Sequence, residues 1–293
     1  MPLTLAVDLG GTNMRVAVVD EHGTIVDRDH APTPHDADTI EPFVALVASM
    51  RHAHPVQHGV VAVPGRVDHL AGTLLHAPNL PPKWLSQITR DALQRALDLP
   101  VVLANDADAA AVGEARFGAA LGHLDVVYLT ISTGVGAGVL VGGRLVLPRY
   151  SAGEVGHTVI DRQAAAAGGA LATVEELGSG TAINRLAGEH ALAARGRVLS
   201  QMVRDGDPAV REIWDEAMSA AGLGAVTLAH LYAPTILVIG GGVGLNADLT
   251  LDPIRASLER FGPLGPPPEV VSAALGDDPG LVGAAGWRAA TGS

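Results

Sequence analysis

The sequence predicts an α/β protein of two lobes with a cleft between them, built by duplication of one architecture. The chain has 293 residues, more than one hydrophobic core usually supports. Short apolar runs alternate with segments of helical spacing, as in α/β folds. Two apolar runs joined by a Gly-rich bend occur near residue 10, and a similar pair recurs about half a chain later.

The first half opens with a predicted β-hairpin. Leu3–Leu9 is an apolar run, glycines interrupt it at 10–11, and a second apolar run covers 14–19. The elements expected next are a strand at 24–26, a loop at 32–38, a helix at 40–50, a strand at 59–63, a helix at 88–97, a strand at 101–103 and an Ala-rich helix beyond it.

The second half repeats this opening. The elements expected there are a strand at 126–131, a turn at 132–138, a strand at 139–141, a helix at 209–231, a buried strand at 235–239, a turn at 240–242, a Pro-rich loop at 262–268 and a final helix at 281–290. We expect a small lobe of residues 1–107 plus about 279–293, and a large lobe of residues 108–278.

Composition excludes several classes of function. Hydrophobic residues are 48% and charged residues 17%, which is typical of a well-buried globular protein. The net charge of −12 disfavours binding to nucleic acid or to anionic membranes. There is no cysteine, no apolar run long enough to span a bilayer and no signal-peptide pattern, so we expect a cytoplasmic protein.

Three Gly-rich turns are candidates for binding phosphate or nucleotide. The first follows Asp8 and contains Gly10, Gly11, Thr12 and Asn13, where Asp8 can hold the water shell of Mg²⁺. The alternative is a plain hairpin bend. The other two turns contain Thr133, Gly134 and Gly136, and Gly240, Gly241 and Gly242. The turn at 132–138 is neither a P-loop nor a dinucleotide fingerprint, since no Lys follows its glycines and a strand is expected after them. For the turn at 240–242 the alternative is a plain tight turn.

Acidic and amide side chains lie at the end of the strand at 101–103. Asn105, Asp106 and Asp108 stand where that strand meets a helix. An acid there is often only a helix cap. A carboxylate at the carboxyl end of a strand can also accept a hydroxyl proton, so we assign Asp106 to catalysis and Asp108 to capping.

A further group of polar residues suits a polyol. Glu154 and His157 lie three residues apart, and Glu175 follows. Carboxylates and an imidazole can each bridge neighbouring hydroxyls of a pyranose. The alternatives are a loop histidine bonded within the protein and solvated glutamates.

These residues together resemble the ROK family (repressor, open reading frame, kinase) of sugar kinases and repressors, which has the actin and hexokinase-like, ribonuclease H-like fold. The resemblance spans nearly the whole chain. It is carried by eight segments in order, at residues 8–13, 63–65, 77–80, 105–106, 133–138, 153–157, 240–243 and 276–280.

The resemblance implies an ATP-dependent hexose kinase with Asp106 as general base. It implies that Gly65, Asn79, Asn105, Asp106, Glu154, His157 and Glu175 bind the hexose. The three Gly-rich turns would bind ATP with Mg²⁺, and a homodimer or higher homo-oligomer is expected. Glucose is the first expected substrate, and N-acetylmannosamine, mannose and fructose are alternatives. A non-catalytic, sugar-responsive regulatory protein is the alternative from another class.

Two departures from the family pattern carry expectations of their own. Repressor members have a helix-turn-helix domain before the kinase core, whereas here the first strand starts at Leu3, so no DNA-binding segment is expected. Family members usually bind zinc through three thiolates and the histidine that corresponds to His157. The chain has no cysteine, and the stretch at 164–169 stands in that place, so we expect no zinc site. Packing of residues 164–172, or a backbone carbonyl, would then support His157.

Overall fold

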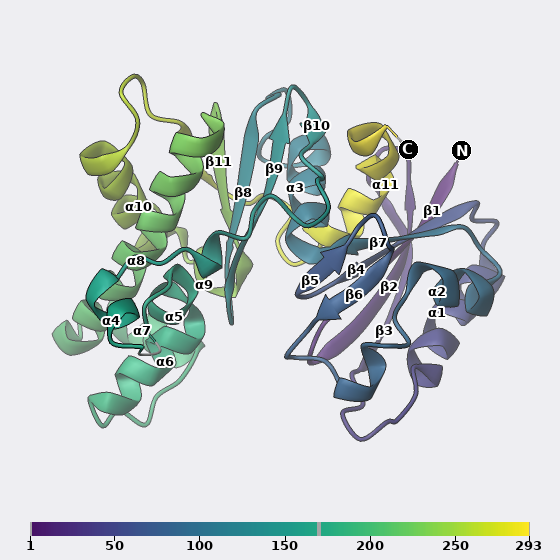
Figure 1. Ribbon diagram of the computed structural model, residues 1–293, viewed down its shortest axis with the longest axis horizontal. Helices are drawn as coiled ribbons and strands as arrows, with labels where there is room; N and C mark the ends of the chain where they lie inside the picture. The colour runs from purple at the N-terminus through teal and green to yellow at the C-terminus, as the bar shows by residue number, and fades with distance from the viewer. Residues whose placement is uncertain (1, 169–170, 293) are drawn as a thin grey trace. The chain divides into compact units, whose positions relative to one another are not determined.

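The computed structural model describes residues 2–168 and 171–292 and contains two sheets of like topology (Figure 1). The first sheet has the strand order β3-β2-β1-β4-β7, and the second has β10-β9-β8-β11-β12. In each sheet the strand that comes first in the chain, β1 or β8, pairs in parallel with a later strand, β4 or β11. That later strand pairs in parallel with the last strand of the sheet, β7 or β12. The predicted duplication is therefore present in the strand order.

Several strand bounds follow the apolar runs, but the strand expected at 24–26 continues through polar residues to Pro32, and the strand expected at 139–141 begins at Val135. The first sheet consists of β1 (Leu3–Leu9), β2 (Asn13–Asp20), β3 (Ile25–Pro32), β4 (His58–Val63) and β7 (Val101–Asn105). The second sheet consists of β8 (Val126–Ile131), β9 (Val135–Val141), β10 (Arg144–Leu145), β11 (Ile236–Gly240) and β12 (Glu269–Ser272). A separate antiparallel ribbon, which was not predicted, is formed by β5 (Arg66–Asp68) and β6 (Thr73–His76).

Helices connect the strands and cover the sheets. They are α1 (Glu41–Ala53), α2 (Arg90–Leu97), α3 (Asp106–Phe117), α4 (Arg162–Ala166), α5 (Val174–Gly178), α6 (Gly180–Glu189), α7 (Arg197–Arg204), α8 (Pro208–Tyr232), α9 (Gly241–Gly244), α10 (Ala247–Phe261) and α11 (Pro279–Thr291), with short 3-10 turns at Pro82–Trp84 and Val155–His157. None of the helices in the described part of the chain is long and apolar enough to cross a membrane.

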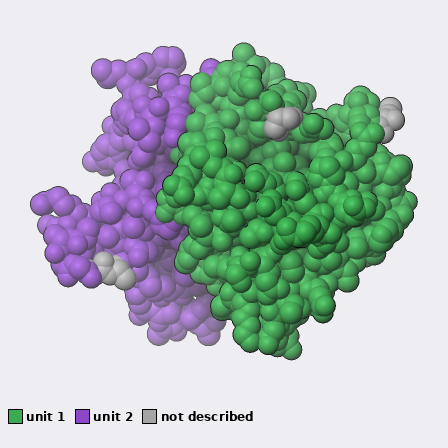
Figure 2. All heavy atoms as spheres, turned by 45° about the vertical axis from the view of Figure 1, so that its right-hand side comes forward, with its two compact units in different colours: residues 1–124, 138–152, 277–293 green, residues 125–137, 153–276 purple. Residues whose placement is uncertain are grey.

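The chain forms two compact units, which Figure 2 distinguishes by colour. Unit 1 comprises residues 1–124, 138–152 and 277–293, and unit 2 comprises residues 125–137 and 153–276. These two units are defined by how densely their residues contact one another. The expected lobe boundary at residue 107 stays a prediction.

Unit 1 is held together by apolar residues on both faces of its first sheet. Alternate β1 residues such as Leu5 and Val7 join a buried cluster with Phe43 of α1 and Leu93 of α2. On the other face α3 packs against α11 through small residues. A Cβ at Gly113 would collide with the backbone of α11, so the axes approach too closely for larger side chains.

Candidate active site

The junction of β7 and α3 carries the predicted catalytic residue. Asn105 is the N-cap of α3, and its Oδ1 accepts hydrogen bonds from the backbone N–H groups of Ala107 (2.9 Å) and Asp108 (3.2 Å). Its Nδ2 donates to the carbonyl oxygen of Gly65 at 2.9 Å. Asp106 therefore begins a helix whose first turn is fixed by the residue before it.

The assignment of Asp108 to capping is wrong. The cap is Asn105, because a capping side chain belongs to the residue that precedes the helix, and the helix begins at Asp106. Asp108 lies in the first turn, is fully buried, and accepts a hydrogen bond from the hydroxyl of Ser151.

Gly65 and Asn79 lie at close backbone approaches within unit 1. Gly65 has φ +88°, and a Cβ there would collide with the carbonyl oxygen of His76. Asn79 lies against Gly11, where a Cβ would approach the Asn79 carbonyl oxygen to 2.7 Å. Within unit 1 the fold thus pairs Gly65 with Asn105, and Asn79 with the first Gly-rich turn.

The first Gly-rich turn is closed by its own backbone. Gly10 N–H donates to the Asn13 carbonyl oxygen at 2.9 Å, and Thr12 accepts from the N–H of Thr33 at 2.9 Å through its carbonyl oxygen. The hydrogen bonds of this bend are those of a tight β1–β2 hairpin. The Gly10 amide is consequently engaged within the protein.

Asp8 at the end of β1 forms an ion pair. Arg15 donates to Asp8 Oδ2 from Nε at 3.0 Å and, at closer range, from Nη2. Its Nη1 donates to the carbonyl oxygen of Asp277 at 2.7 Å. Arg15 thereby joins the predicted phosphate turn to the Gly276–Gly280 segment, one of the eight segments that carried the resemblance.

The second Gly-rich turn is shorter than predicted. Strand β9 begins at Val135, so the predicted turn at 132–138 ends at Gly134, and Gly136 belongs to a strand. Val135, Ala137 and Val139 are buried with the period of two that is typical of a strand, and valine favours strands, so the strand begins at Val135 in spite of the glycines.

Glu175 of α5 closes this turn. Its Oε2 accepts a hydrogen bond from Val135 N–H at 2.9 Å, and a Cβ at Gly134 would collide with the same carboxylate. Residues at the start of α6 bind the turn as well. Gly180 N–H donates to the Ser132 carbonyl oxygen at 2.7 Å, and the Thr181 hydroxyl donates to the Thr133 carbonyl oxygen at 2.7 Å.

Thr181 was missed by the sequence analysis. The signal was the run from Ser179 to Thr181, small and hydroxyl-bearing residues that begin a helix with Ser179 as its cap.

The third Gly-rich turn meets the second inside unit 2. Strand β11 ends at Gly240, and the predicted turn is the short helix α9. Gly241 has φ +83°, and a Cβ there would lie 2.6 Å from the Ile131 carbonyl oxygen. A Cβ at Gly180 would in turn lie 3.1 Å from Val243. Two of the three predicted nucleotide segments are thus neighbours.

The three predicted sugar-binding residues of unit 2 gather around the start of β9. Nε2 of His157 lies 3.7 Å from Oε2 of Glu154. His157 is 73% exposed. A Cβ at Gly156, between them, would lie 3.4 Å from Cβ of Glu175. Glu154, His157 and Glu175 therefore form one group, while Gly65, Asn79, Asn105 and Asp106 belong to unit 1.

The stretch expected to stand in place of a zinc loop is flanked by hydrogen bonds among the residues that the structure describes. Ile160 and Asp161 donate through N–H to the Ala172 carbonyl oxygen at 2.8 and 3.1 Å. Oε2 of Glu176 accepts from the N–H groups of Ala172 (2.9 Å) and Thr173 (3.0 Å). These bonds hold the pKa of Glu176 below its ordinary value.

The zinc donor set is incomplete in this chain. Residues 169–170, part of the stretch predicted to support His157, lie outside the described residues. Among the others, no three His, Asp or Glu side chains are grouped as metal ligands, and the sequence has no cysteine. The residues do not fit a four-ligand zinc site. The absence of zinc itself stays a prediction.

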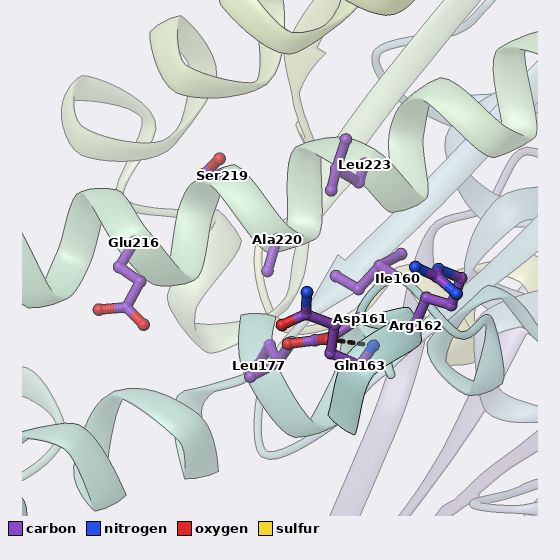
Figure 3. Close-up of a pocket in the computed structure, with 9 residues that line it drawn as sticks. All are labelled: Ile160, Asp161, Arg162, Gln163, Leu177, Glu216, Ser219, Ala220 and Leu223. Atoms are coloured by element: carbon purple, nitrogen blue, oxygen red, sulfur yellow. Dashed lines mark hydrogen bonds between the residues drawn. The ribbon is translucent and has the colours of Figure 1, made fainter. Parts of the chain in front are cut away.

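A cavity of about 380 Å³ lies elsewhere in unit 2, beside α8 (Figure 3). It contains none of the predicted site residues. Its lining residues are Ile160, Asp161, Arg162, Gln163, Leu177, Glu216, Ser219, Ala220 and Leu223. They come from α8, from α5, from the start of α4 and from the two residues that precede it, and Figure 3 labels them all.

Comparison with known proteins places the chain in a family. The model of the ROK family matches residues 4–290. The chain belongs to the ROK family. Among curated relatives, the chain is 35% identical to a glucokinase of Streptomyces coelicolor over 97% of both proteins. It is 34% identical to an N-acetylmannosamine kinase of Escherichia coli over 83% of this chain and 84% of that protein.

Solved structures agree with this ROK membership. A ROK glucokinase from Streptomyces griseus, in complex with glucose and AMPPNP, aligns with a TM-score of 0.81 at 36% identity over 97% of this chain and 98% of that one. The predicted ROK membership and the predicted actin and hexokinase-like α/β fold are both confirmed.

Proposed function

We propose that this ROK protein is an ATP-dependent kinase that transfers the γ-phosphoryl group of ATP to a hexose hydroxyl, with glucose as the first substrate. The observation that carries the proposal is the position of Asp106. It begins α3 at the carboxyl end of β7, behind a cap whose amide is bound to Gly65. The Streptomyces glucokinases that resemble this chain from end to end support the choice of reaction.

Asp106 is the general base in this proposal. The hexose oxygen forms a bond to the γ-phosphorus, the bond from that phosphorus to the β-phosphate oxygen breaks, and the hydroxyl proton passes to the Asp106 carboxylate. The products are a hexose phosphate and ADP. Gly65, Asn79, Asn105, Glu154, His157 and Glu175 are the proposed hexose ligands.

The nucleotide is assigned to the Gly-rich turns. Backbone N–H groups and the Thr12 and Thr133 hydroxyls would contact phosphate oxygens, and the segment from Gly240 to Gly242 would lie against the nucleoside. Mg²⁺, when bound with ATP, supplies positive charge to the phosphates, and Asp8 is the residue proposed to hold its water shell. Because Oδ2 of Asp8 already accepts from Arg15, that guanidinium supplies positive charge at the same carboxylate.

The sugar is assigned in order of support. Glucose comes first because the glucokinases match the chain over nearly its full length. N-acetylmannosamine comes second because a kinase named for it is similar over most of the chain, and mannose and fructose remain alternatives. ATP is the proposed donor, with polyphosphate as the alternative. A cytoplasmic homo-oligomer without a nucleic-acid or membrane partner completes the proposal.

The test is ADP formation by the purified protein with Mg²⁺-ATP and a panel of glucose, N-acetylmannosamine, mannose and fructose. We expect turnover with glucose in the range of about 1 to 100 per second, as for other kinases. Faster turnover of another hexose would reassign the substrate. Sugar binding by calorimetry without turnover of any hexose would favour the non-catalytic, sugar-responsive protein instead.

A further inference from the structure

Three consecutive residues of unit 1, Arg149 to Ser151, are each anchored through their side chains. Arg149 Nε donates to Asp68 Oδ2 at 2.8 Å, and the guanidinium carbon of Arg66 lies 4.2 Å from the centre of the Tyr150 ring. The Ser151 hydroxyl donates to Asp108 Oδ2. Successive anchors of this kind leave the segment little rotational freedom.

The segment that runs from Gly65 to His69, along β5, lies beside the first turn of α3. At one end the Gly65 carbonyl accepts from Asn105 at 2.9 Å. At the other end His69 N–H donates to the Arg149 carbonyl oxygen at 2.9 Å, and His69 Nε2 lies 3.7 Å from Asp108 Oδ2. The first turn of α3 and the segment Arg149 to Ser151 thus share the same support.

Asp108 is the centre of this arrangement. It is fully buried, and an ionised carboxyl in such a place requires compensating donors or cations. The Ser151 hydroxyl is one donor. The His69 imidazole faces it with a buried Nε2 that makes no hydrogen bond to the described residues. Burial lowers the pKa of His69, against a hydrogen bond to the Leu103 backbone and the charge of Asp68.

The connectivity gives this cluster a catalytic consequence. Asp108 stands two residues after Asp106, in the same helical turn. Ser151 stands two residues before Gly153, where the chain passes into unit 2 and the segment with Glu154 and His157 begins. Loosening the bond between Asp108 and Ser151 would therefore first free the turn of α3 that begins with the base.

We propose that Asp108, with Ser151 and His69, is a positioning residue that holds the first turn of α3, and so Asp106, in its reactive orientation. This proposal rests on the proposed kinase function. Misplacing a reacting group by about 1 Å costs up to about 100-fold in rate, so a side chain that touches no substrate can govern turnover.

The experiment compares Ser151→Ala, Asp108→Ala and Asp108→Asn with the wild type. Two sets of measurements are made on each variant: kcat with KM for glucose and ATP, and the hydrogen-exchange protection of the backbone amides of residues 107 and 108 by NMR. Ser257→Ala is the matched control, since it removes a buried hydroxyl of α10 that donates to the Pro253 carbonyl oxygen within its own helix.

We expect Ser151→Ala and Asp108→Ala to lower kcat about tenfold with KM within about twofold, and to speed exchange of both amides. Asp108→Asn keeps an acceptor for the Ser151 hydroxyl and should retain kcat within about threefold. If Asp108→Ala does not fold, Ser151→Ala decides.

Two results would overturn the proposal. One is equal kcat and exchange rates in Ser151→Ala and Ser257→Ala. The other is a lower kcat in Ser151→Ala or Asp108→Ala with unchanged amide-exchange rates, because the loss of turnover would then not arise from a loosened first turn of α3. If the wild type phosphorylates no hexose, the kinase function fails, and the exchange rates alone decide whether Asp108 positions the turn.

Discussion

The side-chain amide of Asn105 donates to the carbonyl oxygen of Gly65 at 2.9 Å, while the other end of the same amide caps α3. One short side chain thus joins the end of β7, the start of α3 and the bend before β5. Asp106 follows directly. Gly65 and Asn105, two of the residues expected to bind the hexose, are therefore connected by hydrogen bonds to the start of the helix that carries the proposed base, and the first two predictions follow from that connection.

Asp106→Asn should keep hexose affinity and lose most turnover. The amide can still bond to the hexose hydroxyl but cannot take its proton, and loss of a general base typically costs about 10²- to 10⁴-fold in rate. Steady-state kinetics and glucose titration measure the two effects. Asp91→Asn, an exposed acid in the first turn of α2, is the control. If Asp106→Asn kept more than half of the wild-type kcat, Asp106 would not be the general base.

Gly65→Ala should destabilise the fold and slow catalysis together. The residue has φ +88°, and its Cβ would collide with the His76 carbonyl oxygen, so the bend must shift and weaken the bond to Asn105. We expect a loss of roughly 1 to 3 kcal/mol of folding free energy from such a conformation.

Gly122→Ala is the matched control for Gly65→Ala. Gly122 has φ +92° but no atom within 4 Å of the Cβ position, so it isolates backbone strain from collision. Thermal melts compare the two variants. Equal melting temperatures of Gly65→Ala and Gly122→Ala would mean that the collision with the His76 carbonyl oxygen costs no folding free energy, and would contradict the prediction.

Glu176 should make stability depend on pH at the acidic end. Backbone N–H groups of Ala172 and Thr173 hold the pKa of its carboxyl below the ordinary value of 4.5. The folded state therefore favours the ionised form. The resulting stabilisation is complete above the ordinary pKa and is lost as pH falls through the lowered one.

Melting temperatures of wild type and Glu176→Gln, measured from pH about 7 to about 3, test this dependence. The two should differ at neutral pH and converge on acidification. Glu259→Gln on α10 controls for the loss of one negative charge. A constant difference between wild type and Glu176→Gln would show that the hydrogen bonds at Ala172 and Thr173 do not require the charge.

The protein should work without zinc. The chain has no cysteine, and His157 alone cannot hold an ion that needs four ligands. The hydrogen bonds that Glu176 accepts from the N–H groups of Ala172 and Thr173 are the candidates for closing this stretch in place of a metal. Metal analysis of purified protein and activity after chelation test this. Stoichiometric zinc, or activity restored by zinc and not by Mg²⁺, would refute the prediction.

Much of the fold was predictable because it rests on local pattern. The β1–β2 hairpin, the long helix α8 and the final helix α11 follow from apolar runs, their period and the Gly or Pro residues that end them. The ribbon of β5 and β6 was missed because its strands are three and four residues long, too short for a period to be recognised.

The sequence by itself determined the family, the repeated α/β architecture and the residues with chemistry to offer, since these depend on residue types at fixed spacing. Only the tertiary structure decided which groups those residues meet. Asp108 is a buried acceptor for the Ser151 hydroxyl and not a cap. Glu175 accepts a hydrogen bond from the N–H of Val135, 40 residues away. Such partners depend on long-range packing, because a buried polar group bonds to whatever donor or acceptor the fold brings within reach.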